Sequence, residues 1–337
     1  MITSTEHLHQ VLFAEPLLRP PCQSRVHPLR SFDYPGVACF VKREDEVGFG
    51  ISGTKLRKYF SLFPRILEEK PDMGVLTGGA SSNHVVSMAQ LLREHGIEPV
   101  AFLLGDPSLP LQGNLLWIHL LIKPENIHWV PRNGWSQLDT LAQEYAEKKK
   151  QEGVIAAVIP KGGSGVGALK GSATLALDIV RNERELGMTF DHLIIDTGTG
   201  LTACALLHAL AYLGKSCEVH MVQMAGTKEE WEEMLKGTHQ EWEDLIQAPS
   251  PFPTRFSLHV PRQAPSFGSV NRQVLQTVID LARGEGFLTD PVFTAKLFSE
   301  GRALIQENSW KGNILFIHSG GALGLSGFSS ALAAVIS

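Results

Sequence analysis

The sequence predicts an α/β protein with two open, mostly parallel sheets flanked by helices. Short apolar runs of four to six residues alternate with helix-like segments. This is the pattern of βαβ units whose strands are buried on both faces. A glycine-rich turn follows each of the runs MGVLT, AAVIP, HLIID and NILFI. The chain has 337 residues, of which 43% are hydrophobic, so it is long enough for two domains with large cores.

The predicted elements follow one another in a regular order. The first fifty residues contain many prolines and short apolar runs, and they end in the strand-like VACFVKRED. Helix-like segments follow the four glycine-rich turns at residues 85–96, 168–185, 203–214 and 322–337. Ligands of open α/β sheets bind at the carboxyl ends of the strands, where these turns lie. We therefore expect all four turns to contribute to one site.

Charge and cysteine usage argue against several classes of protein. The net charge of −5 offers no general surface for polyanions, so we expect no nucleic-acid partner. The four cysteines form no CxxC pair, and we expect neither a metal site nor a disulfide framework. The start MITSTEHLHQ does not read as a secretory signal, and no apolar run reaches the roughly 18 residues of a membrane span. We expect a cytoplasmic protein without a membrane partner.

Residues 227–247, TKEEWEEMLKGTHQEWEDLIQ, stand apart from the repeated pattern because they are strongly acidic. Trp231, Met234 and Leu235 are placed at helical spacing. This spacing predicts a surface helix that its tryptophans pack against the fold. A helix that binds a partner is the alternative.

The turn TGTGLT, Thr197–Thr202, lies between the strand HLIIDT and an apolar helix. Backbone N–H groups at such a helix start can form a cradle for phosphate, although a plain tight turn has the same residues. Gly198, Gly200 and Ala203 also fit the dinucleotide pattern GxGxx(G/A). That pattern requires an acidic residue at the end of the next strand. The strand CEVHMVQM ends in Gln and Met instead, which disfavours a dehydrogenase.

Two further segments carry candidate functional side chains. GGASSNH places Ser81, Ser82, Asn83 and His84 at the start of a helix, and helix capping alone explains only one of the serines. In SGTKLRK, Lys55 directly follows the turn-like Ser-Gly-Thr. A lysine acts as an amine nucleophile when burial or neighbouring cations lower its pKa.

Arg57 and Lys58 lie close to Lys55 in the sequence, and both are interpreted as ordinary surface cations. A solvated surface charge is also the alternative for Lys55 itself, because most lysines are exposed.

Together these motifs resemble the pyridoxal-phosphate enzymes of the tryptophan-synthase-β fold. The branch with 1-aminocyclopropane-1-carboxylate deaminase and D-cysteine desulfhydrase is the most similar. The resemblance extends from about Val41 to Gly324 and rests on seven motifs in the family's order. These are KRED (42–45), SGTKLRK (52–58), SSNH (81–84), VIPKGGSGVGALKG (158–171), TGTGLT (197–202), EGFLTDPVFTAK (285–296) and FIHSGGALGL (316–325).

The resemblance implies a role for each matching position. Lys55 is expected to form the Schiff base with pyridoxal 5'-phosphate and then to move the substrate proton. Asn83 is expected to bond the phenolic oxygen of the cofactor, and Thr294 to face its ring nitrogen. The residues expected to bind the 5'-phosphate are Gly198, Thr199, Gly200, Leu201 and Thr202. The residues expected at the substrate are Ser81, Ser82, His84, Phe267 and Phe293, with Ser82 assisting catalysis.

The resemblance also implies the organisation of the protein. A large domain is expected from residues 1–55 and 161–337, and a small domain from residues 56–160. The cofactor is expected between the two domains. The substrate is expected to be a small amino acid, and the protein a homodimer.

Several positions depart from the family pattern. Thr54 stands where the family has asparagine, and Phe267 and Phe293 stand where it has tyrosines near the substrate. A phenylalanine can neither donate nor accept a proton. Thr294 matches the desulfhydrase branch, whereas the deaminase branch has glutamate there.

The sequence therefore predicts an α,β-elimination like that of D-cysteine desulfhydrase. 1-Aminocyclopropane-1-carboxylate deaminase is the first alternative, and a cofactor-binding protein with little turnover is the second.

Overall fold

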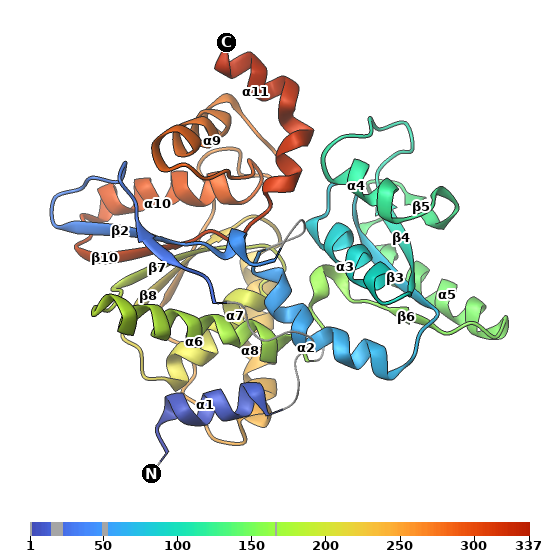
Figure 1. Ribbon diagram of the computed structural model, residues 1–337, viewed down its shortest axis with the longest axis horizontal. Helices are drawn as coiled ribbons and strands as arrows, with labels where there is room; N and C mark the ends of the chain where they lie inside the picture. Colours follow the sequence, from blue (N-terminus) through green and yellow to red (C-terminus); the bar gives the residue numbers. More distant parts are fainter. Residues whose placement is uncertain (1, 15–22, 49–52, 166) are drawn as a thin grey trace.

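The computed structural model describes residues 2–14, 23–48, 53–165 and 167–337 (Figure 1). Two sheets lie side by side, and helices cover the faces of each. This confirms the predicted α/β class with two mostly parallel sheets. Ser52 of SGTKLRK and Cys22 lie outside the described residues. Along the described residues, no helix combines the length and the apolar composition that crossing a membrane requires.

The larger sheet combines the N-terminal strands with the C-terminal half of the chain. Within the described residues its strand order is β1-β2-β10-β7-β8-β9, and all neighbours are parallel except β1 and β2. Its strands are β1 (Val26–Pro28), β2 (Val37–Lys42), β7 (His192–Thr197), β8 (Glu218–Gln223), β9 (Phe256–His259) and β10 (Gly312–Ile317). β7 and β10 are neighbours, so the turns that follow them lie at the same edge of the sheet.

The smaller sheet is built from the middle of the chain. Its order in the described residues is β5-β4-β3-β6, with every pair parallel. Its strands are β3 (Met73–Gly79), β4 (Glu98–Leu104), β5 (Ile127–Val130) and β6 (Ala156–Val158). The central residues of β3 and β4 are buried, as expected for parallel strands covered on both faces.

Helices connect the strands and cover the sheets. They are α1 (Ser4–Phe13), α2 (Lys55–Glu68), α3 (Asn83–Glu94), α4 (Gly113–Leu121), α5 (Leu138–Gln151), α6 (Ala168–Leu186), α7 (Leu201–Tyr212), α8 (Lys228–Ile246), α9 (Arg272–Glu285), α10 (Thr294–Asn308) and α11 (Ser329–Ile336). α2 runs between the two sheets and packs along α6. This close packing needs Gly171 on α6, where a Cβ would lie 2.0 Å from the carbonyl oxygen of Arg57.

The acidic segment at residues 227–247 forms α8, which packs against α7. Trp231, Leu235, Trp242 and Ile246 are buried on its inner face. The prediction of a surface helix packed by its tryptophans is therefore confirmed. The apolar face of α8 packs against the protein's own core.

Two boundaries differ from the sequence prediction. The strand in VACFVKRED ends at Lys42, and Glu44–Glu46 form a 3-10 turn. The C-terminal segment expected as one helix is divided into a 3-10 stretch, Ala322–Phe328, and α11. Glycine has a low helix propensity, and Gly324 and Gly327 lie in the divided part.

Candidate active site

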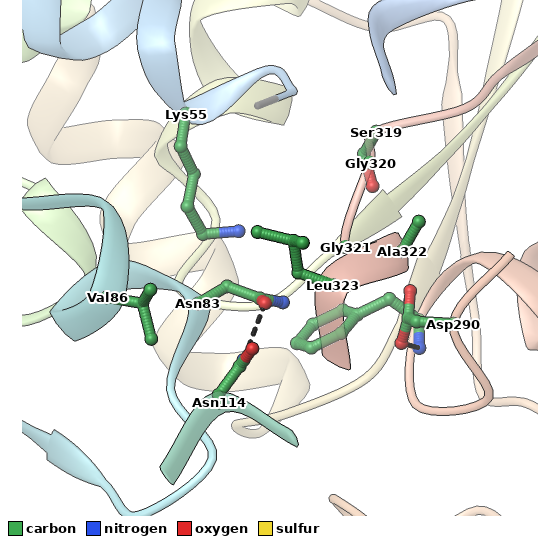
Figure 2. Close-up of a pocket in the computed structure, with 11 residues that line it drawn as sticks. Lys55, Asn83, Val86, Asn114, Asp290, Ser319, Gly320, Gly321, Ala322 and Leu323 are labelled. Atoms are coloured by element: carbon green, nitrogen blue, oxygen red, sulfur yellow. Dashed lines mark hydrogen bonds between the residues drawn. The ribbon is translucent and has the colours of Figure 1, made fainter. Parts of the chain in front are cut away.

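A pocket lies between the two sheets, and Lys55 extends into it (Figure 2). α2 and α3, α4 and the chain after β10 all contribute to its wall. The lining residues are Lys55, Asn83, Val86, Asn114, Asp290, Phe293, Ser319, Gly320, Gly321, Ala322 and Leu323. Two of the four predicted glycine-rich turns, those after β3 and β10, therefore reach the pocket directly.

Lys55 is the first residue of α2, and its position depends on a close backbone contact. The amide N–H of Thr54 donates to the carbonyl oxygen of Ser319 at 3.1 Å. Gly53 has a φ of +103°, and a Cβ there would lie 2.1 Å from the same oxygen. Only glycine permits this conformation and this approach together. The contact places the start of α2 directly beside the turn after β10.

The Lys55 amine has two carboxylates and an aromatic ring in its surroundings. Burial lowers its pKa, and the carboxylates of Asp196 and Asp290 offset part of this effect. Nζ lies 5.7 Å from the centre of the Phe293 ring. A lowered pKa increases the fraction of neutral amine, which is the form that attacks a carbonyl or accepts a proton.

Asn83 presents an amide group to the pocket, and Asn114 fixes its orientation. The Asn114 Nδ2 group donates to Asn83 Oδ1 at 2.8 Å and to the carbonyl oxygen of Ser81 at 2.8 Å. Because Asn83 Oδ1 accepts this bond, its Nδ2 group is left as a donor. This donor suits an anionic or phenolic oxygen in the pocket. Asn114 lies in no recognisable motif, and it was not among the site residues predicted from the sequence.

The other residues of SSNH have different surroundings. Ser82 is the N-cap of α3, and its Oγ accepts from the backbone N–H of Val85 at 3.3 Å. Ser81 is exposed beside it. His84 is buried behind the pocket wall, where Nδ1 shares a hydrogen bond with the Tyr59 hydroxyl at 2.8 Å. Burial lowers the pKa of His84 to about 3, and the charges of Lys58 and Lys55 contribute.

The turn from Gly198 to Thr202 leads into the N-terminus of α7. Gly200 is the N-cap residue with a φ of +97°, and it lets the chain turn directly from β7 into the helix. The first N–H groups of a helix have no partner inside it, so this turn can bind an anion. Ser164 Oγ lies 2.9 Å from Thr199 Oγ1, so the turn after β6 meets this turn.

Lys58 adds a buried cation beside the same pair of turns. Its Nζ donates to the carbonyl oxygen of Gly162 at 2.7 Å, and a Cβ on Gly162 would lie 2.7 Å from Thr199 Cγ2. Burial and the charge of Lys55 lower the pKa of Lys58 to about 7. The interpretation of Lys58 as an ordinary surface cation is wrong, because the side chain is buried.

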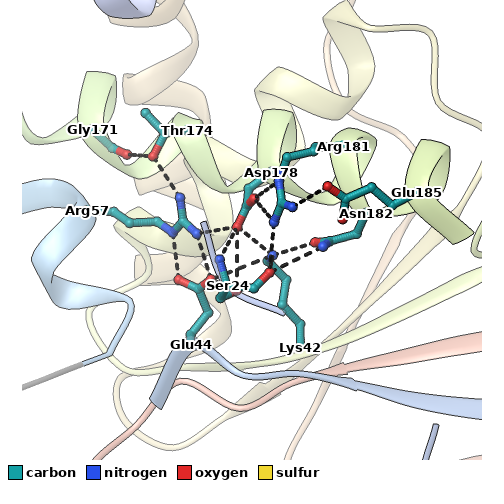
Figure 3. Close-up of polar contacts among 10 residues, drawn as sticks. All are labelled: Ser24, Lys42, Glu44, Arg57, Gly171, Thr174, Asp178, Arg181, Asn182 and Glu185. Atoms are coloured by element: carbon teal, nitrogen blue, oxygen red, sulfur yellow. Dashed lines mark hydrogen bonds and ion pairs between the residues drawn. The ribbon is translucent and has the colours of Figure 1, made fainter. Parts of the chain in front are cut away.

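Arg57 is also buried, in a cluster of charged side chains under α2 (Figure 3). Nε and Nη2 donate to the two carboxylate oxygens of Glu44 at 2.6 and 2.7 Å. Nη2 also donates to Asp178 on α6, and Lys42 Nζ donates to the same carboxylate oxygen at 2.6 Å. Burial raises the pKa of Asp178, but the charges of Lys42 and Arg57 outweigh it and lower this pKa to about 2. The interpretation of Arg57 as a surface cation is therefore also wrong.

This cluster explains why KRED and SGTKLRK occur together in the chain. Lys42 ends β2, Glu44 follows it, and Arg57 lies two residues after Lys55. The ion pairs connect the end of β2, the first turn of α2 and the middle of α6. They hold the helix start that carries Lys55.

The two phenylalanines differ in their position. Phe293 lines the pocket beside Lys55. Phe267 is 62% exposed and is not part of the pocket wall, although its ring meets the Phe293 ring edge to face at 6.1 Å between centroids. The structure therefore places Phe293 in the pocket wall near the Lys55 amine and Phe267 outside that wall.

Thr294 is fully buried, and its hydroxyl is engaged by Asp290. Thr294 Oγ1 donates to Asp290 Oδ2 at 2.9 Å and accepts from the Asp290 backbone N–H at 2.9 Å. Both bonds lie in the turn that leads into α10. Thr294 is absent from the pocket wall, and the hydroxyl that lines the pocket is that of Ser319.

The donor set fits the expected cofactor. A buried amine matches its aldehyde, an amide donor matches its phenolic oxygen, and a helix N-terminus with a nearby cation matches its phosphate. In the described residues, no group of three or more His, Cys, Asp or Glu side chains is arranged to hold a metal ion.

Comparisons with known proteins agree with this chemistry. A family model described as "Pyridoxal-phosphate dependent enzyme" matches residues 21–320. D-cysteine desulfhydrase of Yersinia enterocolitica is 30% identical over 297 residues, covering 87% of this chain and 89% of the relative. A Pyrococcus abyssi protein, provisionally named 1-aminocyclopropane-1-carboxylate deaminase, is 28% identical over 300 residues, covering 86% of each chain.

Solved structures show the same fold. The structure of an ACC deaminase homologue covers 98% of this chain and 99% of its own, with a TM-score of 0.85 and 24% identity. Threonine deaminase isoform 2 from Solanum lycopersicum matches 98% of this chain and 88% of its own, with a TM-score of 0.67 and 16% identity.

Proposed function

The chain belongs to the family of pyridoxal-phosphate-dependent enzymes, and on that premise we propose that it performs an α,β-elimination on a small amino acid, as D-cysteine desulfhydrase does. The observation that carries the proposal is the Lys55 amine in a pocket with Asn83 and Ser319. With cysteine as substrate, cysteine and water give a 2-oxo acid, ammonia and hydrogen sulfide. The relative at 30% identity supports this choice of substrate class.

The cofactor, when bound, withdraws electrons from the substrate and makes its Cα proton acidic. We assign the binding, orientation and proton-transfer roles around the cofactor to the following residues of this chain. Lys55 holds the cofactor and, as a neutral amine, accepts the Cα proton at Nζ. Asn83 donates to the phenolic oxygen, and Asn114 keeps Asn83 in that orientation. Lys58 lies beside the phosphate-binding turn, where a bound anion favours the protonated amine and is attracted by it.

The substrate carboxylate is assigned to the N-terminus of α3. Ser82 caps this helix, and the positive end of the helix favours an anion. Ser81 and Ser82 supply hydroxyl groups at the same place. The Phe293 ring lies over Lys55 Nζ, and we assign to it the exclusion of water from this amine.

1-Aminocyclopropane-1-carboxylate deaminase is the second candidate, supported by the Pyrococcus abyssi relative. Phe293 argues against it, because opening the cyclopropane needs a hydroxyl-based group at the substrate. A cofactor-binding protein with little turnover is the third candidate. The presence of Lys55, Ser82 and Asn83 argues against that reading.

The organisation of the protein is part of the proposal. We propose a large domain of residues 1–55 and 161–337, a small domain of residues 56–160, and a cytoplasmic homodimer. The separate sheets support the division, and the partly exposed apolar helix α11 supports an association between copies. The mass of the protein in solution, measured by light scattering, tests the dimer.

The function is tested first by the visible absorbance of the purified protein with pyridoxal phosphate. We expect a band that is lost in Lys55→Ala and retained in Lys148→Ala, which replaces an exposed lysine on α5.

Release of 2-oxo acid is then measured with D-cysteine, L-cysteine, D-serine and 1-aminocyclopropane-1-carboxylate. We expect the highest kcat/KM with D-cysteine. Faster turnover of the cyclopropane substrate would reverse the order of the candidates.

A further inference from the structure

Trp231 has a buried indole N–H that the roles described above leave unused. It is the fourth residue of α8, and its side chain is buried, with 5% of the residue exposed. Among the residues that the structure describes, its Nε1 atom has no hydrogen-bond partner. An indole N–H can only donate, and burying a donor without an acceptor costs free energy. This N–H therefore indicates a place for a group with free lone pairs.

The edge of the indole that carries this N–H faces the turn at residues 198–202. A Cβ on Gly200 would lie 3.3 Å from Trp231 Cδ1 and 3.6 Å from Trp231 Nε1. The same Cβ would lie 2.8 Å from Met234 Sδ, one helical turn further along α8. Because Gly200 has no Cβ, α8 approaches the backbone of this turn closely. The indole N–H therefore lies beside the N-cap of α7.

Thr197 adds a second buried polar atom directly before the same turn. In the described part of the chain its Oγ1 has no hydrogen-bond partner. Successive side chains of a strand point to opposite faces of the sheet. Ile195, two residues earlier in β7, packs in the same core cluster as Trp231, whereas Ile194 packs in a different one. The Thr197 hydroxyl is therefore on the face of β7 that Trp231 covers.

A bound anion at this turn would give both groups an acceptor. The first N–H groups of α7 have no partner inside the helix, and the positive end of a helix favours an anion. The turn also borders the pocket, because a Cβ on Gly198 would lie 3.5 Å from the ring of Phe293, which lines it. An indole N–H and a hydroxyl can each donate to a phosphate oxygen, and hydrogen bonds to ionised acceptors are roughly twice as strong as those between neutral groups.

We propose that Trp231 is a phosphate-binding residue, whose indole N–H donates to the phosphate group of the cofactor, with the Thr197 hydroxyl donating beside it. The proposal rests on the proposed use of pyridoxal phosphate at Lys55. It extends the phosphate site from the turn after β7 to α8, and it gives the acidic segment at residues 227–247 a part in binding the cofactor. The indole is a neutral donor, so it acts on the phosphate by hydrogen bonding and adds no charge.

The first experiment compares pyridoxal phosphate with pyridoxal, which lacks the phosphate, in spectral titrations of Trp231→Phe. This variant keeps an aromatic ring and removes the N–H. We expect it to bind pyridoxal phosphate about tenfold or more weakly, as for the loss of a hydrogen bond to a charged group, and to keep its affinity for pyridoxal. The matched control is Trp242→Phe on the same helix, whose buried indole donates to Ser250 Oγ at 3.0 Å. It should not distinguish the two compounds.

Thr197→Val, of nearly the same volume, tests the hydroxyl in the same way and should also weaken pyridoxal phosphate but not pyridoxal. The indole N–H signals of the unmodified protein give a measurement that needs no variant, in case Trp231→Phe does not fold. The chain has six tryptophans. We expect one indole proton signal to move downfield when the protein is loaded with pyridoxal phosphate instead of pyridoxal, because a hydrogen bond to an ionised oxygen deshields the proton.

An unchanged affinity of Trp231→Phe for pyridoxal phosphate, or equal losses for the two compounds, overturns the proposal. Indole signals that are the same with both compounds also overturn it, and an unchanged affinity in Thr197→Val overturns the part assigned to the hydroxyl. A protein that takes up neither compound overturns both this proposal and the use of Lys55. Failure to release 2-oxo acid from D-cysteine contradicts only the proposed reaction, because no substrate is present in these measurements.

Discussion

Arg57 Nε lies 2.6 Å from Glu44 Oε2, and neither side chain has exposed surface. The pair joins the first turn of α2 to the end of β2, and Asp178 connects both to α6. A buried charge that loses its partner is strongly destabilising, because the remaining charge has neither water nor a counterion. The ion cluster is therefore a requirement for the position of the helix that carries Lys55.

Replacing Arg57 should destabilise the protein more than replacing Arg25, which forms an exposed ion pair. We expect Arg57→Met to lower the free energy of unfolding by about 3–5 kcal/mol, because Glu44 and Asp178 lose their buried partner. Arg25 forms a similar pair with Glu46, but the two side chains are 59% and 39% exposed. Arg25→Met should cost about 0–1 kcal/mol. Urea unfolding of the two variants measures the difference, and equal losses would contradict the role of the cluster.

Lys58 should affect the binding of the cofactor through its phosphate. We expect Lys58→Met to weaken pyridoxal phosphate about 10–100-fold, since a hydrogen bond to a charged group contributes roughly 1.5–3 kcal/mol. Pyridoxal, which lacks the phosphate, should lose much less affinity. Spectral titration with both compounds measures this, with Lys148→Met as the surface control. An equal loss for both compounds would show that Lys58 does not act on the phosphate.

Asn114 should act on the cofactor through Asn83. Asn114→Ala removes the donor that fixes the Asn83 amide, and we expect pyridoxal phosphate to bind about 5–10-fold more weakly, for a loss of roughly 1 kcal/mol. Asn126→Ala removes a bond to Glu98 on the same small sheet and should leave the affinity unchanged. If both variants bind equally well, Asn114 has no orienting role.

The two phenylalanines should respond differently to an added hydroxyl. Phe293 lines the pocket and Phe267 is mostly exposed. We expect Phe293→Tyr to change the ratio of kcat/KM between D-cysteine and 1-aminocyclopropane-1-carboxylate about tenfold or more, because a hydroxyl beside Lys55 meets the substrate. Phe267→Tyr should change it less than about threefold. The opposite order would show that the outer ring selects the substrate.

A histidine chain across the larger sheet should make stability depend on pH. His192 Nδ1 lies 3.0 Å from His220 Nε2, and His220 Nδ1 lies 3.3 Å from His259 Nε2. Burial lowers the pKa of His220 to about 3, and the two neighbouring histidines contribute. The folded pKa is below the unfolded value of about 6.5, so protons bind preferentially to the unfolded chain.

The stability that neutral His220 contributes is present above pH 6.5 and is lost as the pH falls from about 6.5 towards 3. We expect His220→Phe to lose less stability than the unmodified protein between pH 7 and pH 4.5. His9→Gln, which replaces an exposed histidine, should lose as much stability over this pH range as the unmodified protein. Chemical unfolding at several pH values measures the slopes, and parallel slopes for His220→Phe and the unmodified protein would contradict the prediction.

The motifs located the site because neighbouring positions in the sequence stay neighbours in a turn. SSNH placed Asn83 at the start of α3, and SGTKLRK placed Lys55 at the start of α2, and the pocket contains both. The same motifs did not show which residues of each turn face the pocket and which face away from it. His84 follows Asn83 directly, yet it faces Tyr59 behind the wall. The direction of a side chain depends on the packing of the helix, which the motif does not encode.

Some site residues carried no signal of their own. Asn114 reaches Asn83 because α4 packs beside α3, and no pattern in GNLLWIHLL indicates this contact. Asp196 lies in an ordinary strand sequence, and its carboxylate acts on the Lys55 amine only because β7 and α2 meet in the fold. FIHSGGALGL was recognised as a motif, but its serine became a candidate only when the pocket wall was known.

The alternation of strands and helices, the glycine-rich turns at the strand ends and the lysine at the start of α2 were all predictable from the amino-acid sequence. These follow from local periodicity and from the conformations that glycine allows. The tertiary structure decided which charges are buried. Arg57 and Lys58 look alike in the sequence, yet one joins an ion cluster and the other donates to the carbonyl oxygen of Gly162 in the turn after β6. Burial depends on which elements pack together across the fold, and that contact is not a property of any single segment.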